Sequence, residues 1–453
     1  MPPLNKLQLG CIALAVSQTI AIPLQAATIV VNSSADPAIA NNNQSSCSLR
    51  SAITSANTDT ALSGCASGNG DDTIEFELPN NTTITLNSEL PTVTSNISIN
   101  GTDQDNLTVS GNNNSRIVST ANSANLEISS VTLTNGSVNG NGGAINVGPS
   151  TSLTVNNSTF SNSTAVISSA YPSGLSGLGG AINSSNPSTV TINNSTFTNN
   201  NAYAGAGLYS SSSIVSVANS TFTDNSANFG AGILFNGGVG FAFSNTATVT
   251  NSTFSNNSVS LGPNALGGGA AIADYFSNTT ITNSTISNNN AIGGSTGGGI
   301  YSILSVTTIN NSIISGNTAP GEIAELDDFD TSFSVQNSLL GSAELNNASS
   351  FSFTPNSSNI IATNNGVGLN IPLNEIIEPL ADNGGPTLTN ALPNGSLAIN
   401  AGDNTNCPET DQRGELRNDE GCDIGAFEVV PEIEEETFFT IPLSNNKTVI
   451  FGL

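Results

Sequence analysis

Short runs in which apolar and polar residues alternate recur along the middle of the chain, and residues 189–200 (TVTINNSTFTNN) show the pattern. Val190 and Ile192 alternate with threonines, which predicts a strand with one buried face. Phe197 follows Ile192 at an odd offset, so in an unbroken strand the two side chains would face opposite ways. Because both are apolar, we expect the chain to bend at residues 193–195, where Asn and Ser suit a tight corner.

Two short motifs alternate along the chain. Asn-Ser-Thr-Phe stands at residues 157–160, 194–197, 219–222 and 251–254, and continues in weaker form at 283–286, 311–314 and 337–340. Gly-Gly-Ala-Ile stands at 142–145 and 179–182, and returns in related form at 205–208, 230–233, 269–272 and 297–300. Interleaved motifs at intervals of roughly 25–40 residues indicate a solenoid in which each repeat forms one turn. The glycines predict a second corner, followed by a short strand that carries an inward Ile.

Turns that stack in register place like residues above one another. We expect an internal column of apolar side chains, formed by Phe160, Phe197, Phe222, Phe254, Ile286, Ile314 and Leu340. The asparagines at the corners are expected to form an amide ladder, each side chain bonding to the next about 4.8 Å away. This ladder explains the repeated Asn-Ser-Thr without glycosylation.

Unequal spacing between the motifs predicts where the loops lie. The return from one turn to the next takes 11 residues after Phe197 but 22 after Phe160, where residues 165–178 are additional. Residues 259–266 are additional on another return path, whereas residues 235–245 form an insertion between the two motifs of one turn. Insertions in solenoids gather on one face, which is often the binding face.

The alternation of Gly-Gly-Ala-Ile with Phe-x-x-Asn resembles the repeat of the polymorphic outer membrane proteins. Residues 197–200, 222–225 and 254–257 match, whereas Ser163 departs from the pattern at the end of residues 160–163. The resemblance covers roughly residues 96–340 and implies a right-handed parallel β-helix of the cell surface, often an adhesin. The predicted fold is therefore all-β: a right-handed parallel β-helix solenoid with a short N-terminal capping helix and a small disulfide-bearing C-terminal cap.

Both ends of the solenoid need caps, because open strand edges invite aggregation. Residues 47–53 (CSLRSAI) resemble the CSLREA motif found before such repeats, with Ser51 in place of the acid. Leu49, Ala52 and Ile53 share one helical face, so residues 48–56 are predicted to form a short helix.

Four cysteines follow the first 27 residues as two local pairs. An even number together with export favours two disulfides, although the connectivity does not follow from the sequence alone. A zinc site usually needs closer ligands and His. We therefore expect one disulfide at each end of the solenoid, formed by Cys47, Cys65, Cys407 and Cys422.

Residues 378–428 resemble the choice-of-anchor Q domain. The similarity rests on residues 382–387 (DNGGPT), 411–414 (DQRG) and 422–428 (CDIGAFE), and it implies a surface or extracellular protein. Arg413 and Arg417 stand among several acids, which predicts either internal ion pairs or, as the alternative, a Ca²⁺ site. The acids are Asp403, Asp411, Asp419, Asp423 and Glu428.

The chain divides into five segments. Residues 1–27 read as a secretory signal, with Lys6, an apolar run at 11–22 and small residues before the cleavage zone. The others are an N-terminal cap with the first strands (28–95), the β-helix repeats (96–345), the choice-of-anchor Q-like cap (346–430), and an acidic linker with a terminal tail (431–453). The tail is too short for an outer-membrane barrel, and it is either a sorting signal or a final strand packed on the cap.

Composition narrows the function. The formal net charge is −27 with six basic residues, which excludes nucleic acid as a partner because phosphate binding needs clustered cations. There is no His, the commonest general base and metal ligand. We predict an extracellular or cell-surface location and no cofactor or metal.

The carboxylates of the repeats argue against catalysis. Between Glu127 and Glu322 the only charged residues are Asp224 and Asp274, which stand in different motifs of different turns, each in place of a solvent-facing Asn. Residues 327, 328 and 330 are a further acidic group, expected in a solvated loop. Glycosidases need two carboxyl groups about 5–10 Å apart, so we predict no catalytic residue.

Three functions remain. The first is an adhesin that binds glycans or proteins through its Ser/Asn/Thr face and the loops on one side. Tyrosines in or beside the glycine motifs offer it sugar-stacking surfaces, unless they pack beneath the loops; they are Tyr171, Tyr203, Tyr209, Tyr275 and Tyr301. The alternatives are a polysaccharide lyase or hydrolase, and a passive structural or biofilm spacer.

Overall fold

The computed structural model describes most of the chain between residue 26 and residue 451. The described ranges are 26–37, 45–167, 176–185, 187–238, 245–261, 267–293, 297–320, 325–329, 331–341, 358–362, 369, 371–417, 421–430, 439–443 and 447–451. Nearly all of the expected signal segment, Tyr171, Asp330, Asp419 and most of the acidic linker therefore lie outside the described residues.

One complete turn of the chain consists of four short strands. They are β14 (Ile182–Ser184), β15 (Thr189–Asn193), β16 (Thr196–Thr198) and β17 (Asn201–Ala202), and β18 (Leu208–Ser211) then pairs in parallel with β14. Asn194 occupies the corner between β15 and β16 with φ 49°, so Ile192 and Phe197 are both buried. Gly179 occupies the second corner with φ 67°, where a side chain would collide with the carbonyl of Ile182. Both predicted corners are confirmed.

Successive turns stack into four parallel sheets, named here in the order in which a turn visits them after β14. Sheet 1 has eleven strands: β1 (Thr28–Val31), β2 (Asp72–Phe76), β4 (Ile97–Asn100), β7 (Asn125–Ser129), β11 (Ser152–Asn156), β15, β19 (Ile214–Ala218), β23 (Asn245–Thr250), β27 (Ser277–Thr282), β31 (Val306–Asn310) and β34 (Ser332–Gln336). Sheet 2 has eleven: β3 (Thr82–Thr85), β5 (Leu107–Ser110), β8 (Thr132–Thr134), β12 (Thr159–Ser161), β16, β20 (Thr221–Thr223), β24 (Thr253–Ser255), β28 (Thr285–Ser287), β32 (Ile313–Ser315), β35 (Leu339–Leu340) and β36 (Ile360–Ile361).

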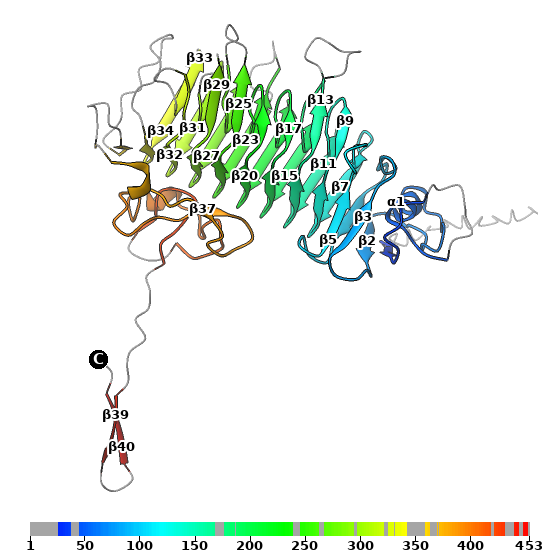
Figure 1. The fold of residues 1–453 in the computed structure, drawn as a ribbon, viewed down its shortest axis with the longest axis horizontal. Helices are drawn as coiled ribbons and strands as arrows, with labels where there is room; N and C mark the ends of the chain where they lie inside the picture. Colours follow the sequence, from blue (N-terminus) through cyan, green and yellow to red (C-terminus); the bar gives the residue numbers. More distant parts are fainter. Residues whose placement is uncertain are drawn as a thin grey trace, which may run out of the picture.

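Sheets 3 and 4 are shorter. Sheet 3 has six strands: β9 (Ser137–Asn139), β13 (Thr164–Val166), β17, β21 (Ser226–Ala227), β25 (Ser258–Leu261) and β29 (Asn290–Gly293). Sheet 4 has eight: β6 (Val118–Ser119), β10 (Ile145–Val147), β14, β18, β22 (Ile233–Asn236), β26 (Ile272–Tyr275), β30 (Ile300–Ile303) and β33 (Leu326–Phe329). The predicted all-β parallel β-helix is confirmed, and its strands lie side by side along one axis (Figure 1).

The core is a column of apolar side chains at the axis. Phe160, Phe197, Phe222 and Phe254 are fully buried, and their rings stack with centroids 4.5–4.9 Å apart and planes within 5° of parallel. Strand pairing continues the column through Ile286, Ile314 and Leu340. The column also extends toward the N-terminus, through Leu133, Val109 and Ile84.

The predicted corner carries single amide bonds between turns, from Asn193 to Asn156 at 3.0 Å and from Asn311 to Asn283 at 3.3 Å, but the continuous amide ladder lies at another corner. The corner residues Asn157, Asn194 and Asn219 are in the left-handed conformation, and the serines that follow them link the turns: the backbone N–H of Ser158 donates to Oγ of Ser195 at 3.2 Å. An unbroken series of amide bonds forms at the next corner, where the last residue of Phe-x-x-Asn is buried. That ladder runs through Asn200, Asn225, Asn257, Asn289 and Asn317.

The N-terminal end carries the predicted helix, α1 (Leu49–Thr58), with Ser48 as its N-cap. Leu49, Ala52 and Ile53 are buried against the first turns, and a disulfide joins Cys47 to Cys65. Arg50 adds two hydrogen bonds, at 2.7 and 2.9 Å, to the buried carboxylate of Asp36. In Figure 1 the helix lies at the N-terminal end of the solenoid.

The C-terminal segment has the predicted disulfide, between Cys407 and Cys422, but it lies along the solenoid (Figure 1). Its secondary structure is sparse: the 3₁₀ turns η1 (Leu373–Glu375) and η2 (Asn404–Asn406), and the antiparallel pair β37 (Leu380–Ala381) and β38 (Thr389–Asn390). It bonds to the outer face of sheet 2 at β20, β24 and β28, where Gln412, for example, accepts a 2.6 Å hydrogen bond from Thr253. The disulfide-bearing segment also packs Ile376, Ile377 and Ile424 with Leu339 near the last turn, and we call it the clamp because its described bonds run along the side of sheet 2.

The terminal tail contains two strands. β39 (Phe439–Leu443) and β40 (Lys447–Phe451) pair with each other in an antiparallel hairpin. Within the described residues they join none of the four parallel sheets. The tail is thus a two-stranded hairpin and not the single final strand, packed on the cap, that was one of the two predicted alternatives.

Candidate functional site

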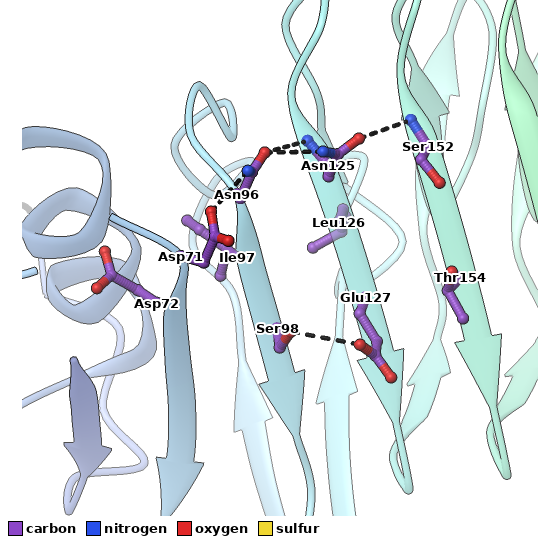
Figure 2. A pocket seen from close by; sticks show the side chains of 10 residues that line it. All are labelled: Asp71, Asp72, Asn96, Ile97, Ser98, Asn125, Leu126, Glu127, Ser152 and Thr154. Carbon is purple, nitrogen blue, oxygen red and sulfur yellow. Dashed lines mark hydrogen bonds between the residues drawn. The ribbon is translucent and has the colours of Figure 1, made fainter. Parts of the chain in front are cut away.

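An open groove runs across the outer face of sheet 1 near its N-terminal end. Strands place their outward residues side by side there, so that Asn96, Asn125 and Ser152 form one row and Ser98, Glu127 and Thr154 the next (Figure 2). Asp71 lies at the end of the first row, whereas Asp72 points away from it toward α1. The groove encloses about 220 Å³.

Hydrogen bonds link the rows and hold their polar groups in place. The Asn96 amide donates to Asp71 at 2.7 Å, and the Asn125 amide donates to the carbonyl oxygen of Asn96 at 2.9 Å. Glu127 accepts from Ser98 at 3.4 Å and from Asn156 at 3.2 Å. The groove therefore presents fixed carboxylate, amide and hydroxyl groups to the solvent.

A second hollow of about 530 Å³ adjoins the first and shares Asn125 and Ser152 with it. Ser188, Thr189, Ser212 and Ser213 line it together with Ile214, which is 62% exposed on β19. Donors and acceptors thus continue along the axis beside one accessible apolar side chain. We call the two hollows together the polar groove.

Four of the five tyrosines gather on the outer side of sheet 4. Tyr203 packs edge-on against Phe229 at 5.5 Å, and Tyr275 against Tyr301 at 6.1 Å. The Tyr209 hydroxyl accepts a 2.8 Å hydrogen bond from Asn236. Tyr203, Tyr209 and Tyr275 border a hollow of about 170 Å³ together with Leu178 and Phe229, and we call it the tyrosine hollow.

The tyrosines are largely buried by one another, which affects their titration. Burial is the main cause that raises the pKa of Tyr301 to about 12, and the charges of Asp327 and Asp328 add to it. Burial also raises the pKa of Tyr209 and Tyr275. Raised pKa values keep Tyr209, Tyr275 and Tyr301 neutral near neutral pH.

Asp274 was predicted to face solvent, but this prediction is wrong, because the residue is fully buried inside the solenoid. Its carboxylate accepts hydrogen bonds from Thr279 at 3.0 Å and from Thr307 at 2.7 Å, and burial raises its pKa to about 6. It stands two residues after Ile272, on the same inward side of β26. Asp224 is exposed, as expected, so the structure does not bring the two together.

The acidic group after residue 325 is also more buried than predicted. Asp327 and Asp328 lie in strand β33 instead of a solvated loop. Register places Asp328 in the interior column of Asp274, two strands further on. The alternation of apolar and polar residues did not predict that Asp274 and Asp328 are buried, because a carboxylate is rarely buried unless it has partners, and the alternation does not show those partners. The hydroxyl-bearing residues at equivalent positions of neighbouring turns were the sequence feature that could have predicted this burial, because they supply hydrogen-bond partners.

The acids of the C-terminal segment bind arginines and backbone N–H groups. Arg413 bonds to Asp411 at 2.8 Å and lies 3.6 Å above the ring of Phe427, and Arg417 pairs with Glu428. Asp423 accepts from the backbone of Asn400 at 2.7 Å. In the described part of the chain no three His, Cys, Asp or Glu side chains are grouped so that they could hold a metal ion. Of the two predicted arrangements, the structure contains the ion pairs.

The polar groove was not singled out from the sequence. Asp71, Asn96, Asn125 and Glu127 stand at polar positions of alternating strands, and only stacking shows that they adjoin. Among the described residues, no helix has the length and apolarity to cross a bilayer. Comparisons with protein-family models, with curated proteins and with solved structures found no match.

Proposed function

We propose that this protein is an exported, non-catalytic β-helix that binds glycans at the polar groove. The groove carries the proposal because it offers amide, hydroxyl and carboxylate groups in fixed rows, and these groups pair with sugar hydroxyls in both directions. The exposed side chain of Ile214 offers an apolar contact for the C–H face of a sugar ring.

The tyrosine hollow supports a second contact surface for the same kind of ligand. Leu178 ends the insertion at residues 165–178 and borders the hollow beside Tyr203. Tyrosine rings bind sugars through their faces and hydroxyls. We propose that the insertion at residues 165–178, inferred from the spacing of the motifs, also contacts a glycan or a partner protein.

Export and surface location are part of the proposal. The signal-like residues 1–27 support them, as do two disulfides, which persist in oxidising compartments. The resemblance of residues 378–428 to the choice-of-anchor Q domain, and of the repeats to the polymorphic outer membrane proteins, supports a cell-surface role. Comparing the location of the full chain with that of a chain lacking residues 437–453 tests the tail as a sorting signal.

A glycan array followed by calorimetric titration tests the groove. We expect Asn125→Ala and Glu127→Ala each to weaken binding of the best glycan about tenfold, because each leaves a groove hydrogen bond unmade. Thr196→Ala, on the outer face of sheet 2, is the matched control and should bind like the unaltered protein. Deletion of residues 168–175 measures the contribution of the loop.

Two outcomes would replace the proposal. If the full chain binds no glycan or matrix protein, it is a passive spacer. If it cleaves acidic polysaccharides, the alternative of a polysaccharide lyase or hydrolase is correct instead. Asp274 offers no group for catalysis, because it is closed off inside the solenoid and a substrate cannot reach it.

A further inference from the structure

The outward residues of sheet 1 form long columns, because its eleven strands stay in one register from end to end. The middle column carries a hydroxyl at every strand except one, where Glu127 stands. It consists of Thr28, Thr73, Ser98, Glu127, Thr154, Thr191, Ser216, Thr248, Thr280, Thr308 and Ser334. A parallel sheet thus repeats the same chemical group every 4.7–4.9 Å or so along the axis.

Three strands beyond the polar groove carry the most regular part of this surface. Their outward residues make a block of three by three, which we call the hydroxyl lattice: Thr246, Thr248 and Thr250 on β23, Asn278, Thr280 and Thr282 on β27, and Val306, Thr308 and Asn310 on β31. All are exposed or half-buried. Within the described part of the chain, none of these side chains makes a hydrogen bond to the protein, so their polar groups face solvent.

The inward side of the same strands is held rigidly. Val249, Ile281 and Ile309 are fully buried in the core. Asp274 accepts hydrogen bonds from both Thr279 on β27 and Thr307 on β31, and so joins the two strands from inside. The C-terminal segment covers sheet 2, so its described bonds leave this face of sheet 1 free. The lattice is therefore fixed in place without being covered.

We propose that the hydroxyl lattice binds the surface of ice. It has no charged and no aromatic residue, whereas protein interfaces are enriched in Tyr, Trp and Arg. Threonine offers a hydroxyl and a methyl group at six of the nine points, with Asn278, Val306 and Asn310 at the others. The points are separated by about 4.8 Å between strands and about 6.6 Å along a strand. These two spacings are close to the repeats of the oxygen lattice of hexagonal ice. Water ordered over such an array already resembles the ice it would join.

The ice site and the glycan site are separate. The polar groove lies on the strands up to β19 and contains two carboxylates, whereas the lattice begins at β23 and contains none. The inference therefore does not rest on the proposed glycan binding, and either one can fail alone.

Partition into slowly growing ice and inhibition of ice recrystallisation test the lattice, using the full chain at micromolar concentration. We expect the protein to enter the ice and to keep crystals small. Thr248→Tyr combined with Thr280→Tyr should reduce both activities at least tenfold, because the rings break the flat array. Thr196→Tyr, at an outward position of sheet 2 on β16, should leave them unchanged. Circular dichroism and the melting temperature establish that all three proteins are folded.

Three results would overturn the inference. The first is exclusion of the unaltered chain from ice, as for an ordinary globular protein of similar size. The second is a double variant that is as active as the unaltered chain, because the lattice would then not be the site. The third is binding to crystalline chitin or cellulose, lost in the double variant, without activity on ice; the lattice would then be a polysaccharide site.

Discussion

Single buried polar residues fix how successive turns align in this core. Asn257 uses its whole amide: it donates to the Phe222 carbonyl and to the Asn289 side chain, both at 2.9 Å, and it accepts two bonds from Asn225. Ser163 stands at the first step, where the repeat motif loses its Asn, and its N–H donates to Asn200. The ladder ends at Glu325, which accepts from Asn317 at 2.6 Å. Each residue therefore satisfies its neighbour, and a buried row of amides is tolerated.

Glu325 makes the stability of the ladder depend on pH. Burial raises its pKa from 4.5 to about 8, against the opposing bonds from Asn317 and Gly316. As the pH rises, Glu325 loses its proton in the unfolded chain before it does so in the folded chain, and this favours unfolding. Its contribution to the free energy of unfolding is therefore complete below about pH 4.5 and decreases between about pH 4.5 and 8. We expect a melting temperature at least about 3 °C lower at pH 8.5 than at pH 5.

Glu325→Gln separates this effect from the general repulsion of an acidic chain. The variant cannot ionise, so its melting temperature should differ less between pH 5 and pH 8.5, measured by calorimetry in matched buffers. Glu75→Gln, on an exposed position of sheet 1, is the control and should keep the full dependence. An identical pH dependence in Glu325→Gln and in the unaltered chain would contradict the assignment.

At the scale of the element, the same motif meets two different environments. The threonine before the phenylalanine points outward from sheet 2 in both β16 and β20, and strand pairing places Thr196 beside Thr221. Thr196 is half-buried, whereas Thr221 is fully buried under the C-terminal segment. Thr221 donates to the Leu388 carbonyl at 2.6 Å and accepts from Gln412 at 2.9 Å. The clamp thus turns a solvent-facing position into an interface.

A matched pair of variants measures the clamp. Thr221→Val removes one hydrogen bond from the Leu388 carbonyl and one from the Gln412 amide, which keep their bond to each other at 3.0 Å. We therefore expect a loss of about 1–2 kcal/mol in the free energy of unfolding, with faster proteolysis of residues 371–430. Thr196→Val should change stability by less than about 0.5 kcal/mol, because no side chain in the described residues depends on that hydroxyl. Equal effects in denaturant titration would show that the segment does not hold sheet 2.

At the scale of the whole molecule, the two disulfides stabilise different parts of the structure, the N-terminal helix and the C-terminal clamp. The bridge from Cys47 to Cys65 fixes α1, whose apolar face closes the core beneath Ile29 and Val31. The bridge from Cys407 to Cys422 lies in the clamp, beside the corner residue Asn283. Only the first therefore protects apolar interior at an end of the solenoid, where exposure leads to association.

Removing each bridge should give different behaviour. Cys47→Ser with Cys65→Ser should cost about 3 kcal/mol and cause aggregation on warming, because α1 detaches from the core. Cys407→Ser with Cys422→Ser should lower the melting temperature without comparable aggregation. Light scattering during a thermal scan distinguishes them, and equal scattering from both double variants would count against the capping role of α1.

The local pattern was enough to predict the turn, the stack and the helix. Alternation in residues 189–192 and the offset of Phe197 required a corner, and repetition required that phenylalanines superimpose. These features follow from period and steric preference, which act between near neighbours and between identical turns. Cysteine spacing likewise indicated both disulfides.

Other features depended on contacts between distant segments. Which Asn forms the ladder depends on whether its side chain points into the solenoid, and Asn194 and Asn200 are alike in sequence context. The burial of Asp274 and Asp328 depends on hydroxyls from neighbouring turns. The polar groove arises where separate strands adjoin. The clamp depends on the return of the chain from residue 371 onward along sheet 2. The sequence alone determined the repeating turn, because its periodicity acts between near neighbours. Only the tertiary structure determined the contacts between the repeats and the other segments, because these contacts require surfaces that form when the chain folds.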